Sequence, residues 1–137
     1  MFITRVLSVI LFLLSTTIQA VEYPVEVIEY LDNTKIVAFL NESDIKKTPQ
    51  WTPLSSEPPL TIAGAIDAVQ KHIKPVKDLS KMNLLGIELK QIPHHKNYWH
   101  YVVKTRTKSG DLPVSHYFVV LMNGKVIPAI KEPESVK

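Results

Sequence analysis

The stretch that decides the fold is Ser115-His-Tyr-Phe-Val-Val-Leu-Met-Asn-Gly-Lys-Val-Ile-Pro-Ala-Ile130. Its Asn123-Gly124 dipeptide is the strongest two-residue hairpin signal, because both residues tolerate positive φ. The flanking residues are rich in apolar side chains, which predicts strands at 115–122 and 125–130. In the first strand both alternating sets of side chains are apolar, so we expect it to be central and covered on both faces.

Two more strands are predicted before this hairpin, at residues 84–92 and 98–107. In the strand at 98–107, successive side chains point to opposite faces. One face carries Trp99, Tyr101 and Val103, and the other carries His100, Val102, Lys104 and Arg106. We expect the aromatic face to meet a helix. Lys104 and Arg106, continued by Lys108, should then form a basic row on the solvent side.

An amphipathic helix is predicted at residues 60–73. Thr61 can cap its start and Pro75 stops it. Apolar side chains recur at helical spacing along it, namely Ile62, Ala65, Ile66, Val69 and Ile73. Val76 to Met82 can add one more helical turn before the sheet resumes.

The chain upstream of this helix divides into a hairpin and a connector. Strands are predicted at 25–31 and 35–40, joined by turn-forming Asp, Asn and Thr residues. Ile28 and Tyr30 fall on the opposite face from the other apolar residues of their strand, which indicates that both faces of this hairpin are partly covered. Residues 41–59 begin with capping residues for a helical turn, after which four prolines exclude a regular element.

The predicted order is therefore ββαββββ. Because hairpins dominate this order, we expect an α+β domain with an antiparallel β-sheet packed on one main helix. The predicted domain spans residues 21–137. It consists of an N-terminal hairpin (21–40), a Pro-rich connector (41–59), the helix plus sheet (60–131) and a tail (132–137).

Residues 1–20 have the order of a secretory signal peptide: a basic start, an apolar middle, and a small residue at the end. The apolar run at 6–14 is shorter than the roughly 20 residues a membrane span needs. We expect cleavage near Ala20 and export to the periplasm or the medium, with membrane contact only through the uncleaved segment. The alternative is a retained membrane anchor.

Composition narrows the function classes. The 137-residue chain has no cysteine, which excludes disulfides, thiolate nucleophiles and Cys-ligated metals. The formal charge is only +3, but residues 21–70 hold eight acids against three lysines, whereas residues 71–137 hold twelve bases against five acids. The two halves either neutralise each other or expose a basic face to an acidic partner. An export signal and few arginines argue against nucleic-acid binding.

The segment Leu60-Thr-Ile-Ala-Gly-Ala-Ile-Asp-Ala-Val-Gln, with Tyr98-Trp-His-Tyr-Val-Val and Tyr117-Phe-Val-Val-Leu-Met-Asn-Gly-Lys-Val-Ile, resembles PepSY-like modules. The resemblance covers about residues 60–130, and it departs from the family at the helix start, where Ala63-Gly64-Ala65 replaces an acidic-Ala pair. It implies a cystatin-like curled sheet around a helix, in exported binding or inhibitory modules, several of them linked to peptidases. It implies no catalytic residue.

These features predict an exported, non-enzymatic binding or inhibitory module that needs no cofactor and recognises a protein or peptide partner, a peptidase being one candidate, through its sheet face. The expected contact residues are Trp51, Tyr98, His100, Lys104, Arg106 and Lys108. The alternative interpretation of Trp51 is that it only anchors the connector to the domain.

Two other functions stay open. One is a small metal-dependent or other hydrolase built on His94, His95, His100 and His116. The simpler interpretation is that these histidines have no chemical role, two of them lying in a polar loop and two in strands of the sheet. The other function is a carrier of a small ligand, held in a pocket between Trp51 and Trp99. No nucleophile elbow, phosphate loop or dinucleotide fingerprint is present.

Overall fold

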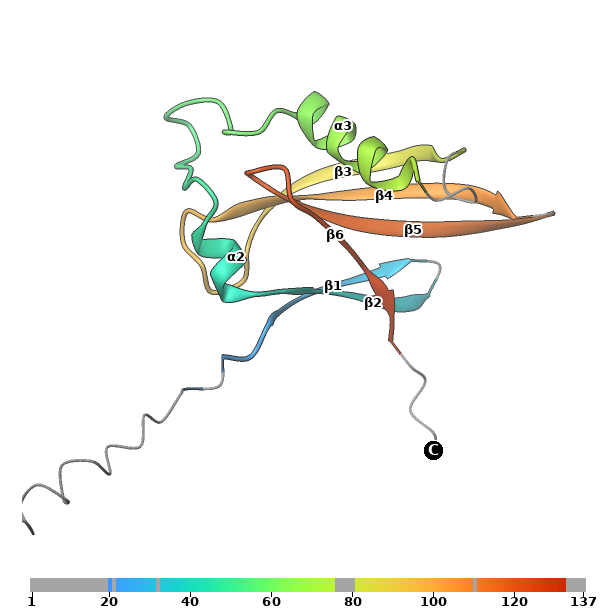
Figure 1. The fold of residues 1–137 in the computed structure, drawn as a ribbon, viewed down its shortest axis with the longest axis horizontal. Helices are drawn as coiled ribbons and strands as arrows, with labels where there is room; N and C mark the ends of the chain where they lie inside the picture. Colours follow the sequence, from blue (N-terminus) through green and yellow to red (C-terminus); the bar gives the residue numbers. More distant parts are fainter. Residues whose placement is uncertain (1–19, 21, 32, 76–80, 110, 133–137) are drawn as a thin grey trace, which may run out of the picture.

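The computed structural model describes residues 20, 22–31, 33–75, 81–109 and 111–132 (Figure 1). The described elements follow in the order β1 (Val25–Leu31), β2 (Thr34–Leu40), α2 (Glu42–Lys46), α3 (Ile62–Ile73), β3 (Asn83–Gln91), β4 (Trp99–Ser109), β5 (Leu112–Leu121), β6 (Val126–Pro128) and β7 (Ile130–Lys131). The α+β class with antiparallel strands is confirmed.

The strands form two sheets, not the one sheet that the sequence predicted. Sheet A has the order β1-β2-β7 and sheet B the order β3-β4-β5-β6. The difference arises at the end of the predicted strand 125–130, which is interrupted at Ala129. Pro128 still pairs with Phe118 of sheet B, whereas Ile130 pairs with Val37 of sheet A. The last strand therefore joins the N-terminal hairpin to the rest of the protein.

The elements stack in three layers, with α3 on one face of sheet B and sheet A on the other (Figure 1). Two apolar cores hold the layers together. The core between the sheets consists of Val27, Ala38, Leu40, Ile45, Ile92, Val102, Tyr117, Val119 and Leu121. The core under the helix consists of Ala65, Val69, Ile73, Tyr101, Val103, Phe118, Val120 and Met122.

These cores confirm the predicted helix-facing side of β4 and the predicted coverage of β5 on both faces. Tyr101 and Val103 of β4 are buried against α3, and Trp99 packs partly against them. β5 sends Tyr117 toward sheet A and Phe118 toward α3, so it is covered on both sides, as its two apolar sets predicted. Asn123 and Gly124 do lie in the turn between β5 and β6, but the predicted two-residue turn is wrong. Leu121 N–H donates to the Lys125 carbonyl, so Met122 belongs to the turn as well, and of the Asn-Gly pair Gly124 alone has a positive φ, 87°.

Helix α3 begins where Thr61 predicted, because the Oγ1 of Thr61 accepts a hydrogen bond of 3.0 Å from the Gly64 N–H. Its apolar stripe is only partly used. Ala65, Val69 and Ile73 are buried, but Ile62, which the sequence placed in the core, is exposed. The helix packs mainly on β4, β5 and β6. The helix-side face of β3 is therefore only partly covered, with Ile87 and Leu89 partly buried against the core under the helix.

Several predictions fall beyond the described ranges. Residues 1–19 of the predicted signal segment, residues 76–80 of the predicted extra helical turn and residues 133–137 of the tail lie outside them. Among the helices that are described, none has the length and apolar character needed to cross a membrane.

Candidate functional site

The outer edge of sheet B is formed by β3. This strand pairs with β4 on one side, and no other described strand pairs with it. Its N-terminal half carries Leu84 and Leu85, both about half exposed, next to an irregularity in register before Gly86. Edge strands present unpaired backbone N–H and C=O groups, and proteins usually guard them with charges or prolines. Here the edge is long and partly apolar.

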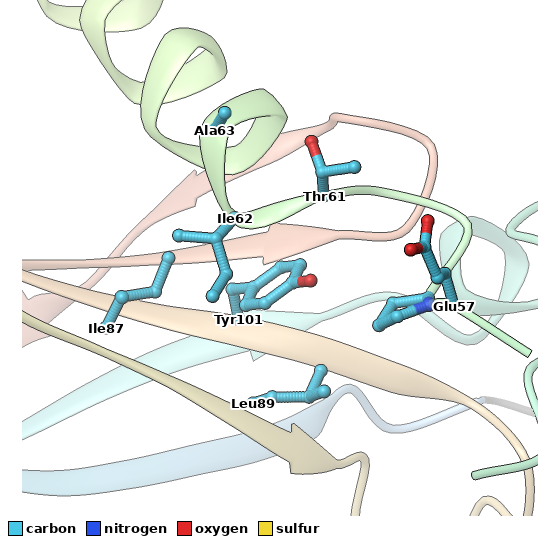
Figure 2. Close-up of a pocket in the computed structure, with 8 residues that line it drawn as sticks. Glu57, Thr61, Ile62, Ala63, Ile87, Leu89 and Tyr101 are labelled. Carbon is cyan, nitrogen blue, oxygen red and sulfur yellow. The ribbon is translucent and has the colours of Figure 1, made fainter. Parts of the chain in front are cut away.

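A cleft of about 410 Å³ opens beside this edge, between β3 and the first turn of α3. It is lined by Glu57, Pro58, Thr61, Ile62, Ala63, Ile87, Leu89 and Tyr101. Figure 2 shows Ile62 reaching from the helix toward Tyr101 and Ile87, with Leu89 on the opposite wall. The walls are mainly apolar, so the cleft suits an aliphatic or aromatic group.

The floor of the cleft is fixed by Tyr101. Its ring is buried, and its hydroxyl donates a hydrogen bond of 2.6 Å to the Leu60 carbonyl just before the helix. This bond ties β4 to the start of α3 and satisfies the polar end of a buried tyrosine. Burial also raises the pKa of Tyr101 above its ordinary value of 10. The floor is thus neutral and fixed in position.

One acidic group stands at the rim. Glu57 is exposed and lines the cleft (Figure 2), as does Pro58, the next residue in the chain. Among the described residues, no ion pair involves its carboxylate, unlike those of Glu29, Glu42 and Glu88. A ligand with an apolar group in the cleft can therefore place a cation at the rim.

The other face of β3 carries a charged cluster, which we define as Glu29, Glu88, Lys90 and Lys104. Lys90 Nζ pairs with Glu29 and lies 3.1 Å from Glu88 Oε2. Lys104 Nζ lies 3.3 Å from Glu88 Oε1 and 3.6 Å from Glu29 Oε2. Hydrogen bonds from Lys90 and then Lys104 lower the pKa of Glu88, while the bond to Glu29 is the main cause of the raised pKa of Lys90.

The expectation that Lys104 and Arg106 face open solvent is wrong. They lie on the face of β4 that sheet A covers, and Lys104 is held in the charged cluster. Arg106 is half-buried, and its Nε lies 3.5 Å from Ser115 Oγ. Lys108, nearer the end of β4, is the exposed member of the three. A continuous basic row is therefore not presented to a partner.

His100, another predicted contact residue, is inside the protein. It is 1% exposed, and neither ring nitrogen has a hydrogen-bond partner. Burial lowers its pKa to about 4, with the positive charge of Lys90 as a smaller contribution, so the ring is neutral at pH 7. A partner cannot touch this side chain unless the sheets separate.

Trp51 and Tyr98 attach the connector to sheet B. The Trp51 ring meets the Trp99 ring edge-on with 5.2 Å between centroids. The backbone N–H of Trp51 donates to the Asn97 carbonyl at 2.8 Å, and its indole Nε1–H donates to the Ser56 carbonyl at 3.0 Å. Tyr98 Oη accepts a 3.0 Å hydrogen bond from Gln50. Trp51 does not line the cleft. These contacts agree with the interpretation in which Trp51 anchors the connector to the domain.

The four histidines considered for a metal or hydrolase site do not come together. His94 is exposed in a loop with a φ of 61°. His95 lies 2.7 Å from Glu42 and 2.6 Å from the Pro93 carbonyl, and His116 lies 3.0 Å from Thr107 Oγ1. In the ranges that the structure describes, no group of three or more His, Asp or Glu residues is placed to hold a metal ion.

The cleft and the open β3 edge were missed by sequence reasoning. Two signals were present, namely Ile62 at the start of the helix stripe and the consecutive Leu84 and Leu85 at the start of a strand. Neither signal predicts that the helix α3 packs nearer to β5 than to β3. Comparisons of the chain with protein-family models, with curated proteins and with solved structures found no match.

Proposed function

We propose that this protein is an exported, non-enzymatic binding module that captures an extended peptide segment of a protein partner along β3. The observation that carries this proposal is the open β3 edge lying directly beside the apolar cleft. Export rests on the pattern of residues 1–20. The absence of a catalytic constellation in the sequence motifs is the reason to propose binding without turnover.

The proposed mode is strand addition. A peptide that pairs with the free edge of β3 gains main-chain hydrogen bonds, which provide affinity without sequence preference. Its side chains then alternate between the two faces of sheet B. One set enters the cleft between Ile62 and Leu89, while the other lies beside Glu88 and Lys90. Specificity follows from an apolar side chain on the first face and a polar one on the second.

The PepSY-like assignment remains part of the proposal. What supports it is a capped helix followed by four antiparallel strands, with an aromatic β4 and an Asn-Gly turn after β5. Sheet A is an addition to that pattern. A peptidase is the partner that the resemblance implies.

A matched pair of tryptophan substitutions tests the site. Ala63→Trp fills the cleft from the exposed first turn of α3, and Gln70→Trp adds the same bulk to an exposed position on the same helix. We expect the unaltered protein to enrich peptides with an aliphatic residue from a random peptide display library. Ala63→Trp should weaken binding of an enriched peptide about tenfold or more in fluorescence anisotropy, and Gln70→Trp should leave it unchanged. No enrichment, or equal binding by both variants, contradicts the proposal.

A carrier of a small apolar ligand is the second candidate, because the cleft alone could hold one. Hydrogen exchange separates the two functions. A bound peptide strand protects backbone amides along the outer edge of β3, whereas a small ligand in the cleft leaves them exchanging at the free rate. Protection confined to the cleft-lining residues with a small apolar probe such as a fluorescent fatty acid would favour the carrier.

A further inference from the structure

The cleft beside β3 has one polar side chain that the fold does not already use. The Tyr101 hydroxyl donates to the Leu60 carbonyl, and Thr61 Oγ1 accepts from the Gly64 N–H at the start of α3. The third polar lining residue, Glu57, is exposed and has no ion-pair partner in the part of the chain that the structure describes. Among the described residues that line the cleft, none is basic. A ligand in the cleft therefore meets one unpaired negative charge.

The connector places Glu57 on the side of the cleft where β3 ends. The carbonyl of the preceding residue, Ser56, accepts the hydrogen bond from the Trp51 indole, and the Trp51 ring packs edge-on against Trp99. Trp99 lies opposite Gln91, the last residue of β3. The chain just before Glu57 is therefore tied to the C-terminal end of that strand.

The apolar part of the cleft lies further back along β3. Leu60, three residues after Glu57, is bonded to Tyr101, which lies opposite Leu89. Ile87, two residues before Leu89 in the same strand, also lines the cleft. Figure 2 shows the same order, with Tyr101 between Ile87 and Glu57. The cleft thus runs along β3 from an apolar end at Ile87 to an acidic end at Glu57.

Strand geometry sets the spacing of the side chains that a peptide presents to this cleft. In a strand paired with β3, every second side chain points to the helix side, so two such side chains lie roughly 6.6 Å apart along the strand. When one of them is apolar and packs on Ile87 and Leu89, the next one lies toward Glu57. Lysine and arginine suit that position, because their aliphatic stems can lie on an apolar wall while the charged end reaches the carboxylate.

The other face of β3 adds no comparable preference. The side chain between the two that enter the cleft points toward the charged cluster, whose two acids and two lysines already pair with one another. Their formal charges cancel. Glu57 is therefore the group of the proposed peptide site that can select a charged side chain.

We propose that the peptide captured along β3 carries a lysine or arginine two residues away from the apolar residue that fills the cleft, with Glu57 as its counter-ion. This inference rests on the proposed function and names the side chain that the same site selects. The basic residue precedes the apolar one in a peptide antiparallel to β3, and follows it in a parallel one. Arginine should bind at least as well as lysine, because a guanidinium can donate two parallel hydrogen bonds to one carboxylate.

Peptide selection tests the preference. From a random peptide display library, the unaltered protein should enrich lysine or arginine two positions from the aliphatic residue. Glu57→Lys, checked for folding by circular dichroism melting, should enrich aspartate or glutamate at that position instead. Aliphatic enrichment with no charge preference at that position in either selection overturns this inference and leaves the peptide site intact. No aliphatic enrichment by the unaltered protein overturns both.

A double-mutant cycle measures the pairing itself. An enriched peptide is compared with its norleucine version, in which the basic residue keeps an aliphatic stem but loses its charge. In fluorescence anisotropy at low ionic strength, Glu57→Gln should weaken the basic peptide about two- to fivefold and leave the norleucine peptide unchanged. Glu26→Gln removes the same charge from an exposed position in sheet A and should change neither affinity.

Ala63→Trp separates the two levels of the proposal. Because it fills the cleft, it should weaken the basic and the norleucine peptide alike. If it does so while Glu57→Gln weakens both peptides equally or neither of them, Glu57 is not the counter-ion and this inference is wrong. If Ala63→Trp weakens neither peptide, the cleft is not the binding site and the proposed function is wrong as well.

Discussion

Glu29 in β1 and Lys90 in β3 form an ion pair that links sheet A to sheet B. The carboxylate also lies 3.6 Å from Lys104, so one acidic side chain faces two lysines of the other sheet. The Glu29 side chain is 13% exposed and that of Lys90 is 42% exposed, so the carboxylate is shielded from solvent while the ammonium group stays partly open to it. Together with the hydrogen bond from the Tyr117 hydroxyl to the Val27 carbonyl, this pair adds polar contacts with defined partners to the apolar packing between the two sheets.

The first prediction concerns this link. Glu29→Gln should lower the free energy of unfolding by about 1–2 kcal/mol, because Lys90 and Lys104 then share only Glu88. Urea unfolding at pH 7 measures the change. Glu26→Gln makes the same chemical change on the exposed face of β1 and should stay within about 0.5 kcal/mol of the parent. Equal losses in the two variants would mean that Glu29 does not connect the sheets.

Local signals predicted the strands and their faces well. Alternation in β4 separated Tyr101 from Val102, and these residues do belong to different cores. The Asn123-Gly124 dipeptide predicted the turn between β5 and β6 but not its register, because a two-residue turn pairs Met122 with Lys125, whereas here Leu121 bonds to Lys125 and Val120 lies opposite Val126. The faces of β4 and the place of this turn depend on residues close together in the chain, so the sequence alone could specify them.

The two-sheet arrangement could not be predicted in the same way. It depends on Ile130 pairing with Val37, far away in the sequence, and on a strand interruption at Ala129. Pro128 signals the interruption locally but does not say that the chain then joins another sheet. That pairing covers the His100 face of β4, which the sequence analysis left open to solvent. The cleft depends likewise on where α3 lies across sheet B. Periodicity identifies the buried stripe of a helix but not which strands it packs on.

A second prediction concerns the titration of His100. We expect its pKa, followed by NMR, to be about 4, below the ordinary value of 6.5. Between these values the unfolded chain binds a proton that the folded protein excludes. The free energy of unfolding should therefore fall as pH drops from 6.5 to 4, by at most about 3 kcal/mol.

His100→Leu serves as the control for this effect. It should raise stability at pH 7 by about 1 kcal/mol, because it removes two buried nitrogens that lack hydrogen-bond partners. His100→Leu should also remove most of the decrease in the free energy of unfolding at acid pH. A smaller part of this decrease should remain, because burial lowers the pKa of His116 as well. An unchanged slope in His100→Leu would assign the acid sensitivity to other groups.

A third prediction concerns the attachment of the connector. Trp51→Ala should lower the free energy of unfolding by about 1–2 kcal/mol, because the edge-on contact with Trp99 and the bond to Ser56 are both lost. Trp51→Phe keeps an aromatic ring against Trp99 and should lose less. Thermal unfolding compares the two. If Trp51→Ala melts with the parent but abolishes peptide capture, Trp51 contacts the partner and the anchoring role is wrong.

A fourth prediction concerns His95, which joins the loop before β4 to α2. Its Nδ1 lies 2.6 Å from the Pro93 carbonyl and its Nε2 lies 2.7 Å from Glu42 Oε2, so both nitrogens face acceptors and the doubly protonated ring is favoured. The carbonyl of Pro93, followed by Glu42, raises the pKa of His95 above 6.5. Because the pKa of His95 is higher in the folded protein than in the unfolded chain, its contribution to the free energy of unfolding is fully present below the unfolded-chain pKa. This contribution is lost as the pH rises through the pKa of the folded protein.

The expected result is an NMR titration midpoint for His95 above 6.5 and well separated from that of His100. Glu42→Gln should lower the His95 midpoint without returning it fully to 6.5, because the Pro93 carbonyl still accepts a hydrogen bond from Nδ1. A His95 midpoint that does not respond to Glu42→Gln would show that the imidazole and the carboxylate are not paired in solution.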